Sequence, residues 1–379
     1  MLTSPPLALY IHLPWCERKC PYCDFNSYQR TAQPPFAAYA ARLLDDLEQD
    51  LGFVAGRGIG SIFIGGGTPS LFPAAVVSSL LAGVRERLVL APDAEVTLEA
   101  NPGSAEAARF RGYRAAGVSR ISIGVQSFAD ACLRALGRVH DAREAHAAIA
   151  AARAAGFASF NIDLMHGLPQ QSPAMALADL EQAIAHEAPH LSWYQLTVEP
   201  NTAFHSAPPA LPAEDQLAEI QDRGEELLER HGYEQYEVSA WARPGQRCRH
   251  NINYWHFGDY IGIGAGAHGK LTLPAQCRVM RTRKTRVPGD YLAGAAASIR
   301  SDTVVPRDEL ALEFLMNALR LCEGASVAQF EACTGLAYAT IAPRVEALRS
   351  SGLLVAQAGR LCTTARGFRH LNTVLEAFF

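Results

Sequence analysis

The sequence contains no run of about 20 apolar residues, which is the length that a membrane-spanning helix needs. Its first residues, MLTSPPLALYIHLPWC, lack the basic segment and the long apolar segment of a secretory signal peptide. Basic charge is not in excess either, because 34 Lys and Arg stand against 38 Asp and Glu, for a net charge of −4. We therefore expect a cytoplasmic protein with no nucleic-acid partner. Peripheral attachment to the inner face of the membrane is the alternative placement.

The sequence also lacks the cysteine pattern of a disulfide scaffold. The nine cysteines are odd in number and the chain is long, so we expect them to be reduced. Six are scattered singly, and most of them are expected to be small buried hydrophobic residues; they are Cys132, Cys248, Cys277, Cys322, Cys333 and Cys362. The other three, Cys16, Cys20 and Cys23, lie within eight residues and need a separate explanation.

Short apolar segments alternate with amphipathic segments over the first 200 residues. Strands are predicted at residues 7–12, 61–64, 94–99, 120–124, 159–164 and 191–198. Helices are predicted between them at residues 36–51, 74–88, 105–116, 142–155 and 173–186. This alternation indicates an α/β protein with a parallel sheet, and the number of repeats favours a partial TIM-like (β/α)6 barrel over a small doubly wound domain.

The rest of the chain is less regular. A helix is predicted at residues 214–231 and a strand at 233–239, followed by the glycine-rich run YIGIGAGAHG. Helices at 307–321, 326–334 and 338–350, then short strands at 353–356 and 361–363, outline a winged-helix-like domain without a basic recognition helix. We expect a core at residues 1–240, a connecting region at 241–305 and a C-terminal domain for packing or partner docking at 306–379.

The three clustered cysteines have the spacing C-x3-C-x2-C and follow the first predicted strand. Three thiolates on one short loop can each bind one iron of a cubane [4Fe–4S] cluster, which leaves the fourth iron open for another ligand. Zinc is the alternative, but a structural zinc site takes four ligands, and the sequence has no second C-x2-C pair.

With the aromatic Tyr22 before its last cysteine, this loop resembles the signature of the radical S-adenosylmethionine (SAM) superfamily. The resemblance implies that SAM binds the open iron and that neighbouring strand ends hold it. These cofactor-binding residues would be Tyr10, Tyr22, Gly66, Gly67, Thr68, Glu99, Gln126, Arg138, Asp163, Gln195 and His268. Taken singly, the glycines can serve a tight turn and the charged residues a structural ion pair. The run from Gly262 to Gly269 opens no βαβ unit, so we reject a dinucleotide site and expect it to close over the adenosyl group.

Longer motifs restrict the resemblance to a smaller group within the radical-SAM superfamily. The segments YIHLPWCERKCPYCDFNSY, IFIGGGTPS, TLEANP, SIGVQSF, NIDLMHGLP and CRHNINYW resemble those of oxygen-independent coproporphyrinogen III oxidases and of the related HemW-type heme chaperones. The oxidases carry a fourth cysteine two residues after the third, where this chain has Phe25. They also carry an extension before the first strand, where this chain has about six residues. Both features favour the chaperone branch.

A third feature is the H-N-x-x-Y motif of His250, Asn251 and Tyr254, which the resemblance assigns to heme binding. Imidazole and phenolate are both known axial ligands of heme iron, and Cys248 is a further candidate ligand. A packed aromatic segment is the alternative. The basic residues nearby could neutralise heme propionates or an acidic partner, or form a solvated flexible loop. They are Arg278, Arg281, Arg283, Lys284 and Arg286.

We therefore expect a heme chaperone that binds a [4Fe–4S] cluster, SAM and heme, and transfers heme to targets such as respiratory cytochromes or their membrane complexes. The alternatives are a coproporphyrinogen III oxidase, which would decarboxylate its substrate by radical chemistry, and a radical-SAM activity on another tetrapyrrole. No catalytic residue is assigned, and a homodimer is a further hypothesis.

Overall fold

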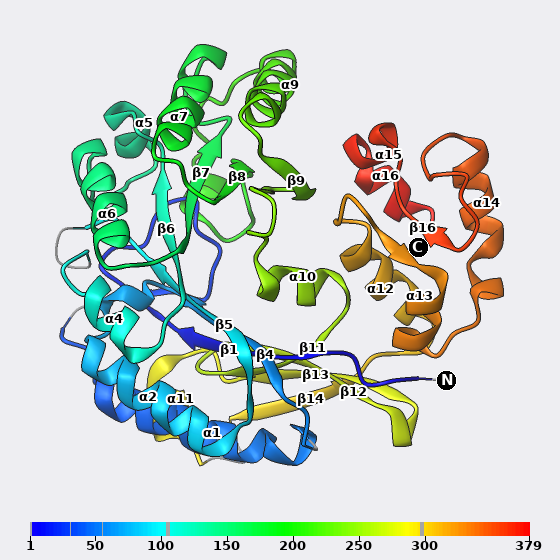
Figure 1. Ribbon diagram of the computed structural model, residues 1–379, viewed down its shortest axis with the longest axis horizontal. Coiled ribbons are helices and arrows are strands. Elements are labelled where there is room, and N and C mark those ends of the chain that lie inside the picture. The colour runs from blue at the N-terminus through cyan, green and yellow to red at the C-terminus, as the bar shows by residue number, and fades with distance from the viewer. Residues whose placement is uncertain (1, 31, 55, 104–106, 296–298) are drawn as a thin grey trace.

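Six parallel strands form the curved sheet that the alternation in the sequence predicts (Figure 1). The structure is a computed structural model that describes residues 2–30, 32–54, 56–103, 107–295 and 299–379. The strands are β1 (Leu7–Leu13), β4 (Ile59–Gly66), β5 (Leu90–Ala100), β6 (Arg120–Gln126), β7 (Ser159–His166) and β8 (His190–Gln195). Each pairs in parallel with the next along the chain, so their carboxyl ends gather at one end of a partial barrel.

Amphipathic helices cover the outer face of this sheet (Figure 1). They are α1 (Phe36–Val54), α2 (Ala74–Arg87), α4 (Phe110–Ala116), α5 (Asp130–Ala135), α6 (Ala142–Ala154) and α7 (Pro173–Ala185). Helix α6 begins with a capping box between Asp141 and Glu144, and α7 begins where Ser172 accepts a bond from the Met175 amide. The first two residues of the helix predicted at 105–116 lie outside the described residues, and α4 covers Phe110–Ala116 of that range.

The sheet continues beyond the barrel on both sides, to twelve strands in all within the described residues. Strand β11 (Asp259–Ile263) pairs in parallel with β1, and β12 (His268–Leu273), β13 (Arg278–Lys284) and β14 (Arg300–Val304) follow it as antiparallel neighbours. On the far side β8 is followed by β10 (Ala240–Ala242) and β9 (Glu234–Glu237). Residues 278–284 of the basic segment therefore form a strand that is paired on both sides, and the alternative of a flexible loop is wrong for them.

Shorter elements connect these strands. The cysteine loop contains β2 (Trp15–Cys16) and β3 (Tyr28–Gln29), and the 3-10 turn η1 (Pro69–Leu71) follows β4. After β8 come α8 (Ala203–Ser206), α9 (Glu214–Arg230) and α10 (Arg249–Trp255). The turn η2 (Pro274–Gln276) precedes β13, and α11 (Pro288–Ala293) follows it. No helix in the described ranges combines the length and the apolar character that crossing a membrane requires.

A second hydrophobic core holds the C-terminal domain together, with Phe314 and Phe330 fully buried in it. Its elements are α12 (Leu310–Ala318), β15 (Ala325–Ser326), α13 (Val327–Thr334), η4 (Tyr338–Thr340), α14 (Ala342–Ser350), β16 (Arg360–Leu361), α15 (Ala365–Arg369) and α16 (Leu371–Glu376). The three predicted helices are present. The predicted hairpin is reduced to one bridge, Leu354 to Thr363, because β16 pairs with β15 instead, and the last two helices were not predicted.

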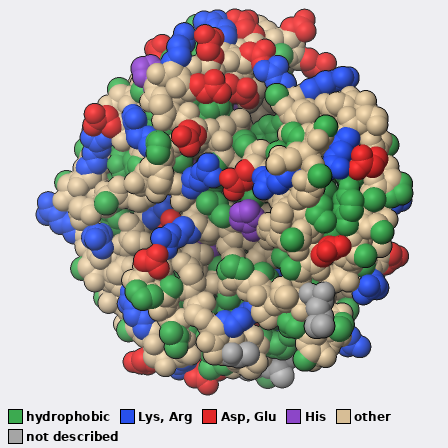
Figure 2. Space-filling view, turned by 45° about the vertical axis from the view of Figure 1, so that its right-hand side comes forward, with side chains coloured by type: hydrophobic (Ala, Val, Ile, Leu, Met, Phe, Trp, Pro, Cys, Tyr) green, Lys and Arg blue, Asp and Glu red, His purple; other side chains and the backbone are tan. Residues whose placement is uncertain are grey.

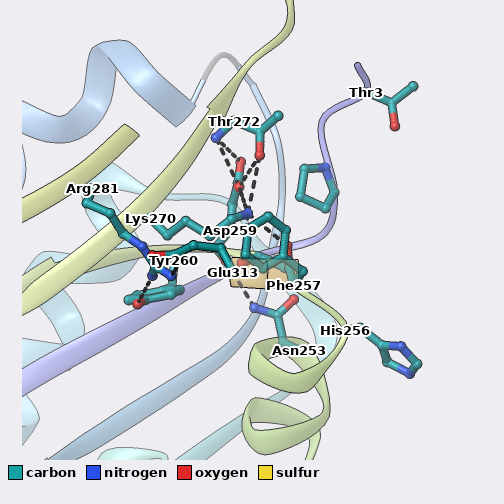
Figure 3. A network of polar contacts seen from close by, with 12 residues as sticks. Thr3, Asn253, His256, Phe257, Asp259, Tyr260, Lys270, Thr272, Arg281 and Glu313 are labelled. Carbon is teal, nitrogen blue, oxygen red and sulfur yellow. Dashed lines mark hydrogen bonds and ion pairs between the residues drawn. The ribbon is translucent and has the colours of Figure 1, made fainter. Parts of the chain in front are cut away.

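A buried polar network joins the barrel to this domain (Figure 3). The Lys270 ammonium lies 3.0 Å from the Asp259 carboxylate, donates to the Phe257 carbonyl at 2.7 Å and sits 4.1 Å above the Phe257 ring. That ring in turn packs edge-on against Phe314 of α12 at 5.7 Å between centroids. The C-terminal domain is thus anchored at the end of the barrel where β1 begins, opposite the carboxyl ends of the strands.

Ion pairs at the surface add a second set of links. Basic and acidic side chains are interspersed over the face shown in Figure 2. Arg320 of the C-terminal domain lies 3.8 Å from Glu237 of β9, and Arg369 lies 2.7 Å from Asp222 of α9. The Arg369–Asp222 pair is exposed and contributes less than about 1 kcal/mol, whereas the Glu237 carboxylate is buried.

Candidate functional site

The cysteine loop is fixed to the barrel by backbone hydrogen bonds. Cys16 lies in β2, directly after β1, and β2 pairs in parallel with β3. The Arg30 amide donates to the Cys16 carbonyl at 2.9 Å, and the Cys23 amide donates to the Cys20 carbonyl at 3.1 Å. Lys19 also reaches back to the carbonyls of Phe25 and Ser27, both at 3.2 Å. These hydrogen bonds hold the loop in a defined shape.

All three cysteines line one cavity of about 380 Å³, which we call the cysteine cavity. In the described part of the chain, no three His, Cys, Asp or Glu side chains converge closely enough to hold a single metal ion. This spacing suits a cubane, in which each thiolate binds a different iron, better than zinc, whose ligands converge on one ion. The Arg138 guanidinium donates to the Cys20 sulfur at 3.6 Å and can offset the charge of a thiolate. The residues present therefore fit a [4Fe–4S] cluster.

The glycines after β4 let the next loop approach the cysteine loop. Gly66 has a φ of 116°, which favours glycine. A Cβ on Gly67 would lie 2.6 Å from the Trp15 carbonyl oxygen, a distance that no side chain tolerates. The Thr68 amide donates to the same carbonyl at 2.8 Å. The glycine loop and the cysteine loop therefore form one continuous wall.

Acidic groups stand at the strand ends opposite this wall. Glu99 accepts a hydrogen bond from the Gly66 amide at 3.0 Å, and its burial, reinforced by Asp163, raises its pKa to about 8. Burial also raises the pKa of Asp163, although Ser122 and Asn161 donate to its carboxylate at 3.1 and 2.7 Å. Buried carboxyl groups need a cationic or hydrogen-bonding ligand to be stable in their charged form. The site is thus suited to a ligand that carries an ammonium group and hydroxyl groups.

Most of the residues predicted to bind SAM line the cysteine cavity. They are Tyr22, Gly66, Gly67, Thr68, Glu99, Gln126, Arg138, Asp163 and Gln195. Sequence reasoning missed Asn101, Ser122 and Tyr194, which line the same cavity. Asn101 lies two residues after Glu99 in TLEANP and accepts from Arg138 at 2.8 Å. The alternation of side chains along a strand could have indicated Ser122 and Tyr194 as neighbours of predicted residues.

The other two predicted residues, Tyr10 and His268, line a different and larger cavity of about 720 Å³. Phe63 and Tyr254 also line it, so we call it the aromatic cavity. Its volume is within the range of cofactor and ligand sites. The two cavities share lining residues at Phe25, Gly66 and Glu99, so they adjoin at the carboxyl end of the barrel. The glycine-rich run thus faces the second cavity rather than the cysteine cavity.

Two members of the H-N-x-x-Y motif do not reach the aromatic cavity. His250 is fully buried on α10, its ring stacked on Phe63 at 5.1 Å, and burial lowers its pKa to about 3. Asn251 does not line the cavity either, whereas Tyr254 does. Cys248 is also buried, near Glu95 at 3.5 Å, and burial raises its pKa to about 12. His250 therefore lies in a packed aromatic segment, which was the alternative to heme binding, one layer behind the wall of the aromatic cavity.

The basic residues between positions 278 and 286 differ in whether the protein already neutralises them. Lys284 is buried and pairs with Asp46 and Asp50, and Arg281 is bound by Tyr260 at 2.9 Å and by Glu313. These two cations are already neutralised by the protein. Arg283 and Arg286 line the aromatic cavity together with Lys284, and Arg286 donates weakly to Asn26 at 3.4 Å. Arg278, at the start of β13, does not line it.

Two family models match the chain. The Radical SAM superfamily matches residues 10–183, and the HemN C-terminal domain matches residues 305–370. The first match contains the cysteine loop and four of the strand ends that line the cysteine cavity, those of β4, β5, β6 and β7. The second contains most of the C-terminal domain.

Two heme chaperones match over almost the whole length of the chain, and a third relative matches over part of it. The chain is 51% identical to the heme chaperone HemW of Escherichia coli strain K12, over 100% of this chain and 99% of that protein. It is 47% identical to the heme chaperone HemW of Haemophilus influenzae, over 99% and 98% of the two chains. It is also 42% identical to the mitochondrial radical S-adenosyl methionine domain-containing protein 1 of Mus musculus, over 71% of this chain and 61% of that one.

The solved structure of the coproporphyrinogen III oxidase HemN from Escherichia coli, a radical SAM enzyme, has the same fold. The TM-score is 0.83, with 23% sequence identity, over 99% of this chain and 90% of that one. At this identity the likeness defines the architecture alone. The barrel and the C-terminal helical domain are thus those of a HemN-like radical SAM protein.

Proposed function

The chain belongs to the HemW family of heme chaperones within the radical SAM superfamily, and from that premise we propose that it binds heme and transfers it to acceptor proteins. The observation that carries this proposal is the pair of adjoining cavities. One is lined by the three cysteines, and the other is lined by aromatic and cationic side chains. Heme is a flat, apolar ring with two carboxylates, so the second cavity matches its chemistry.

The cysteine cavity would hold the cofactors that the superfamily implies. Cys16, Cys20 and Cys23 would bind the [4Fe–4S] cluster, which when bound supplies one-electron chemistry to SAM. Glu99 and the glycine loop would take the amino group of SAM, because a buried carboxyl group gains most from a cationic partner. Asp163 would accept bonds from its ribose hydroxyls. Arg138 would stay beside Cys20 and stabilise the thiolate there.

Phe25 favours the chaperone function over the oxidase alternative. Its side chain is 61% exposed and lines both cavities, at the position where the oxidases carry a fourth cysteine. A phenyl ring can pack against a porphyrin but cannot bind iron or stand in for a thiol. We therefore favour storage and transfer of heme over decarboxylation of coproporphyrinogen III.

The proposed transfer of heme requires acceptor proteins as partners. We propose respiratory cytochromes or their membrane complexes as acceptors, met at the inner face of the membrane by a cytoplasmic protein that acts alone or as a homodimer. Co-purification of heme-loaded protein with membranes that contain or lack such complexes would test the choice of acceptor.

A substitution that blocks the aromatic cavity would test the proposed function. Ser301 on β14 lines the aromatic cavity and not the cysteine cavity, so Ser301→Trp should fill the former and leave SAM binding intact. Reconstituted protein is titrated anaerobically with heme and then mixed with an apo-cytochrome. Wild type and the matched Ser301→Ala variant should bind and transfer heme, and Ser301→Trp should do neither. Equal heme binding by all three would refute the assignment of the cavity, and conversion of coproporphyrinogen III to protoporphyrinogen by wild type would refute the chaperone proposal.

A further inference from the structure

His268 is the first residue of β12 and opens onto the aromatic cavity. Glycines fix its position. Gly264 has a φ of 107°, and a Cβ there would lie 2.3 Å from the His12 carbonyl oxygen. A Cβ on Gly262 would lie 1.8 Å from the carbonyl oxygen of His268 itself. The glycine-rich run thus turns tightly against the segment that leads into the cysteine loop, and it sets His268 on a rigid base at the edge of that loop.

The imidazole of His268 has no hydrogen bond or ion pair with any of the described residues. Partial burial, and then the nearby Arg283, Arg281 and Arg286, lower its pKa from the usual value. A neutral imidazole has a free nitrogen lone pair, which is the form that binds iron. The same cations would keep a proton off the ring while they attract an anionic ligand to it.

The other nitrogen and phenol groups at this cavity are already engaged. Both ring nitrogens of His12 are bonded, Nδ1 to the Tyr10 hydroxyl at 3.0 Å and Nε2 to the Asn26 carbonyl at 2.9 Å. Burial raises the pKa of Tyr254 well above its usual value, and Tyr260 stacks on its ring at 4.2 Å. Since tyrosine binds heme iron as the phenolate, Tyr254 is a better stacking surface than a ligand.

His250 is a poorer candidate for a different reason. It is buried one layer below the cavity wall, with Nδ1 held by the Ser61 hydroxyl at 3.0 Å. Its Nε2 lacks a partner, but α10 would have to leave β4 before that nitrogen could meet a ligand as large as heme. His268 reaches the same cavity with no rearrangement.

Cations lie on the same wall as His268. Arg283 is its direct cross-strand partner on β13, and its side chain has no hydrogen bond or ion pair with the described residues. Arg286 lies just past the end of the same strand. Arg300, which also lines the cavity, is already paired with Asp50 and Asp302. Guanidinium groups bind carboxylates with two parallel hydrogen bonds, so Arg283 and Arg286 match the two propionates of heme.

We propose that His268, rather than His250, is the axial ligand of the heme iron, and that Arg283 and Arg286 bind the heme propionates. The inference rests on the proposed function, since it specifies how heme occupies the aromatic cavity. The glycine-rich run then has a role at the heme site instead of over the adenosyl group of SAM.

The iron ligand can be tested apart from folding by using heme and metal-free protoporphyrin IX as probes. Protein with its cluster reconstituted should give a ferric heme spectrum that shifts in His268→Gly, and added imidazole should restore the wild-type Soret band. Metal-free protoporphyrin has no iron to ligate, so wild type and His268→Gly should bind it equally. The exposed His231→Gly is the matched control and should leave both spectra unchanged. An unchanged heme spectrum in His268→Gly together with a lost one in His250→Gly would overturn the assignment.

The propionate partners need a second probe. Arg283→Gln should weaken binding of heme and of metal-free protoporphyrin about tenfold, the effect of losing a charge-assisted hydrogen bond. It should not change binding of protoporphyrin dimethyl ester, which has no free carboxylates. Equal losses with acid and ester would contradict the role of Arg283. If wild type binds no heme at all, the proposed function itself fails, whereas wild-type binding that ignores His268 and Arg283 refutes only this inference.

Discussion

The imidazole Nδ1 of His250 lies 3.0 Å from the hydroxyl oxygen of Ser61, inside the barrel and out of reach of solvent. This contact ties α10 to the middle of β4, the second strand of the barrel. It also makes the H-N-x-x-Y motif a structural element at the floor of the aromatic cavity. Tyr254, one helical turn later, is the part of the motif that the cavity exposes.

The burial of His250 predicts an acid-sensitive fold. Its pKa is lowered from 6.5 to about 3 in the folded protein, so between these values the unfolded chain binds a proton that the folded chain does not. The resulting stability is present above pH 6.5 and is lost as the pH falls towards 3, by at most about 5 kcal/mol. Urea unfolding at pH 7, 6 and 5 should show this loss, and His250→Asn should flatten the slope relative to wild type.

A matched control shows whether the dependence of stability on pH comes from His250. His231 is exposed at the end of α9, so His231→Asn should follow the wild-type dependence on pH. Burial also lowers the pKa values of His140 and His166 to about 4, so some slope persists in every variant. The assignment is wrong if His250→Asn and wild type lose stability in parallel.

Nine of the eleven residues that the sequence predicted to bind SAM line the cysteine cavity, although Asn101, Ser122 and Tyr194 of the same cavity were missed. Glu99, Gln126 and Asp163 stand at the ends of strands whose order follows from βα alternation, so their convergence needs no knowledge of tertiary contacts. His268 is different, because its cavity forms only when β11 pairs with β1 and the sheet continues to β14. No local pattern indicates that long-range pairing. Likewise, the motif around His250 gave no signal that α10 would pack its histidine inward.

Each of the three clustered cysteines should be needed for the cluster. Serine in place of Cys16, Cys20 or Cys23 removes one iron ligand and should abolish the brown chromophore after anaerobic reconstitution. Iron and acid-labile sulfide analysis measures the loss. Cys277 is exposed on the turn before β13, so Cys277→Ser should retain the full chromophore. If all three variants kept four irons per chain, the central assignment would fail.

The contact between the glycine loop and the cysteine loop predicts a steric effect. In Gly67→Ala the new methyl group would lie 2.6 Å from the Trp15 carbonyl oxygen, which is backbone and cannot rotate away. We expect the two loops to separate, with reduced cluster occupancy and weaker SAM binding by equilibrium dialysis. Gly52→Ala is the control, because no atom lies within 4 Å of a Cβ there and the helix α1 should gain up to about 1 kcal/mol. Full cluster content and SAM affinity in Gly67→Ala would contradict the proposed continuity of the wall.

The buried Lys270–Asp259 pair, which joins β12 to β11, predicts a large loss of stability when it is broken (Figure 3). Lys270→Met leaves the fully buried Asp259 carboxylate without its ammonium partner, and breaking such a pair costs about 3–5 kcal/mol. Arg57 still lies 2.8 Å from that carboxylate, so we expect a loss near the lower value, measured by urea unfolding. Asp259→Asn should cost a similar amount, because it leaves the Lys270 ammonium buried instead.

The double variant decides whether the pair acts as a unit. Lys270→Met with Asp259→Asn removes both charges. The double variant should therefore lose less stability than the sum of the two single losses, by more than about 1 kcal/mol. The exposed pair of Arg369 and Asp222 is the control, and its double-mutant cycle should give less than about 1 kcal/mol. Strictly additive losses at Lys270 and Asp259 would mean that each side chain acts through other contacts.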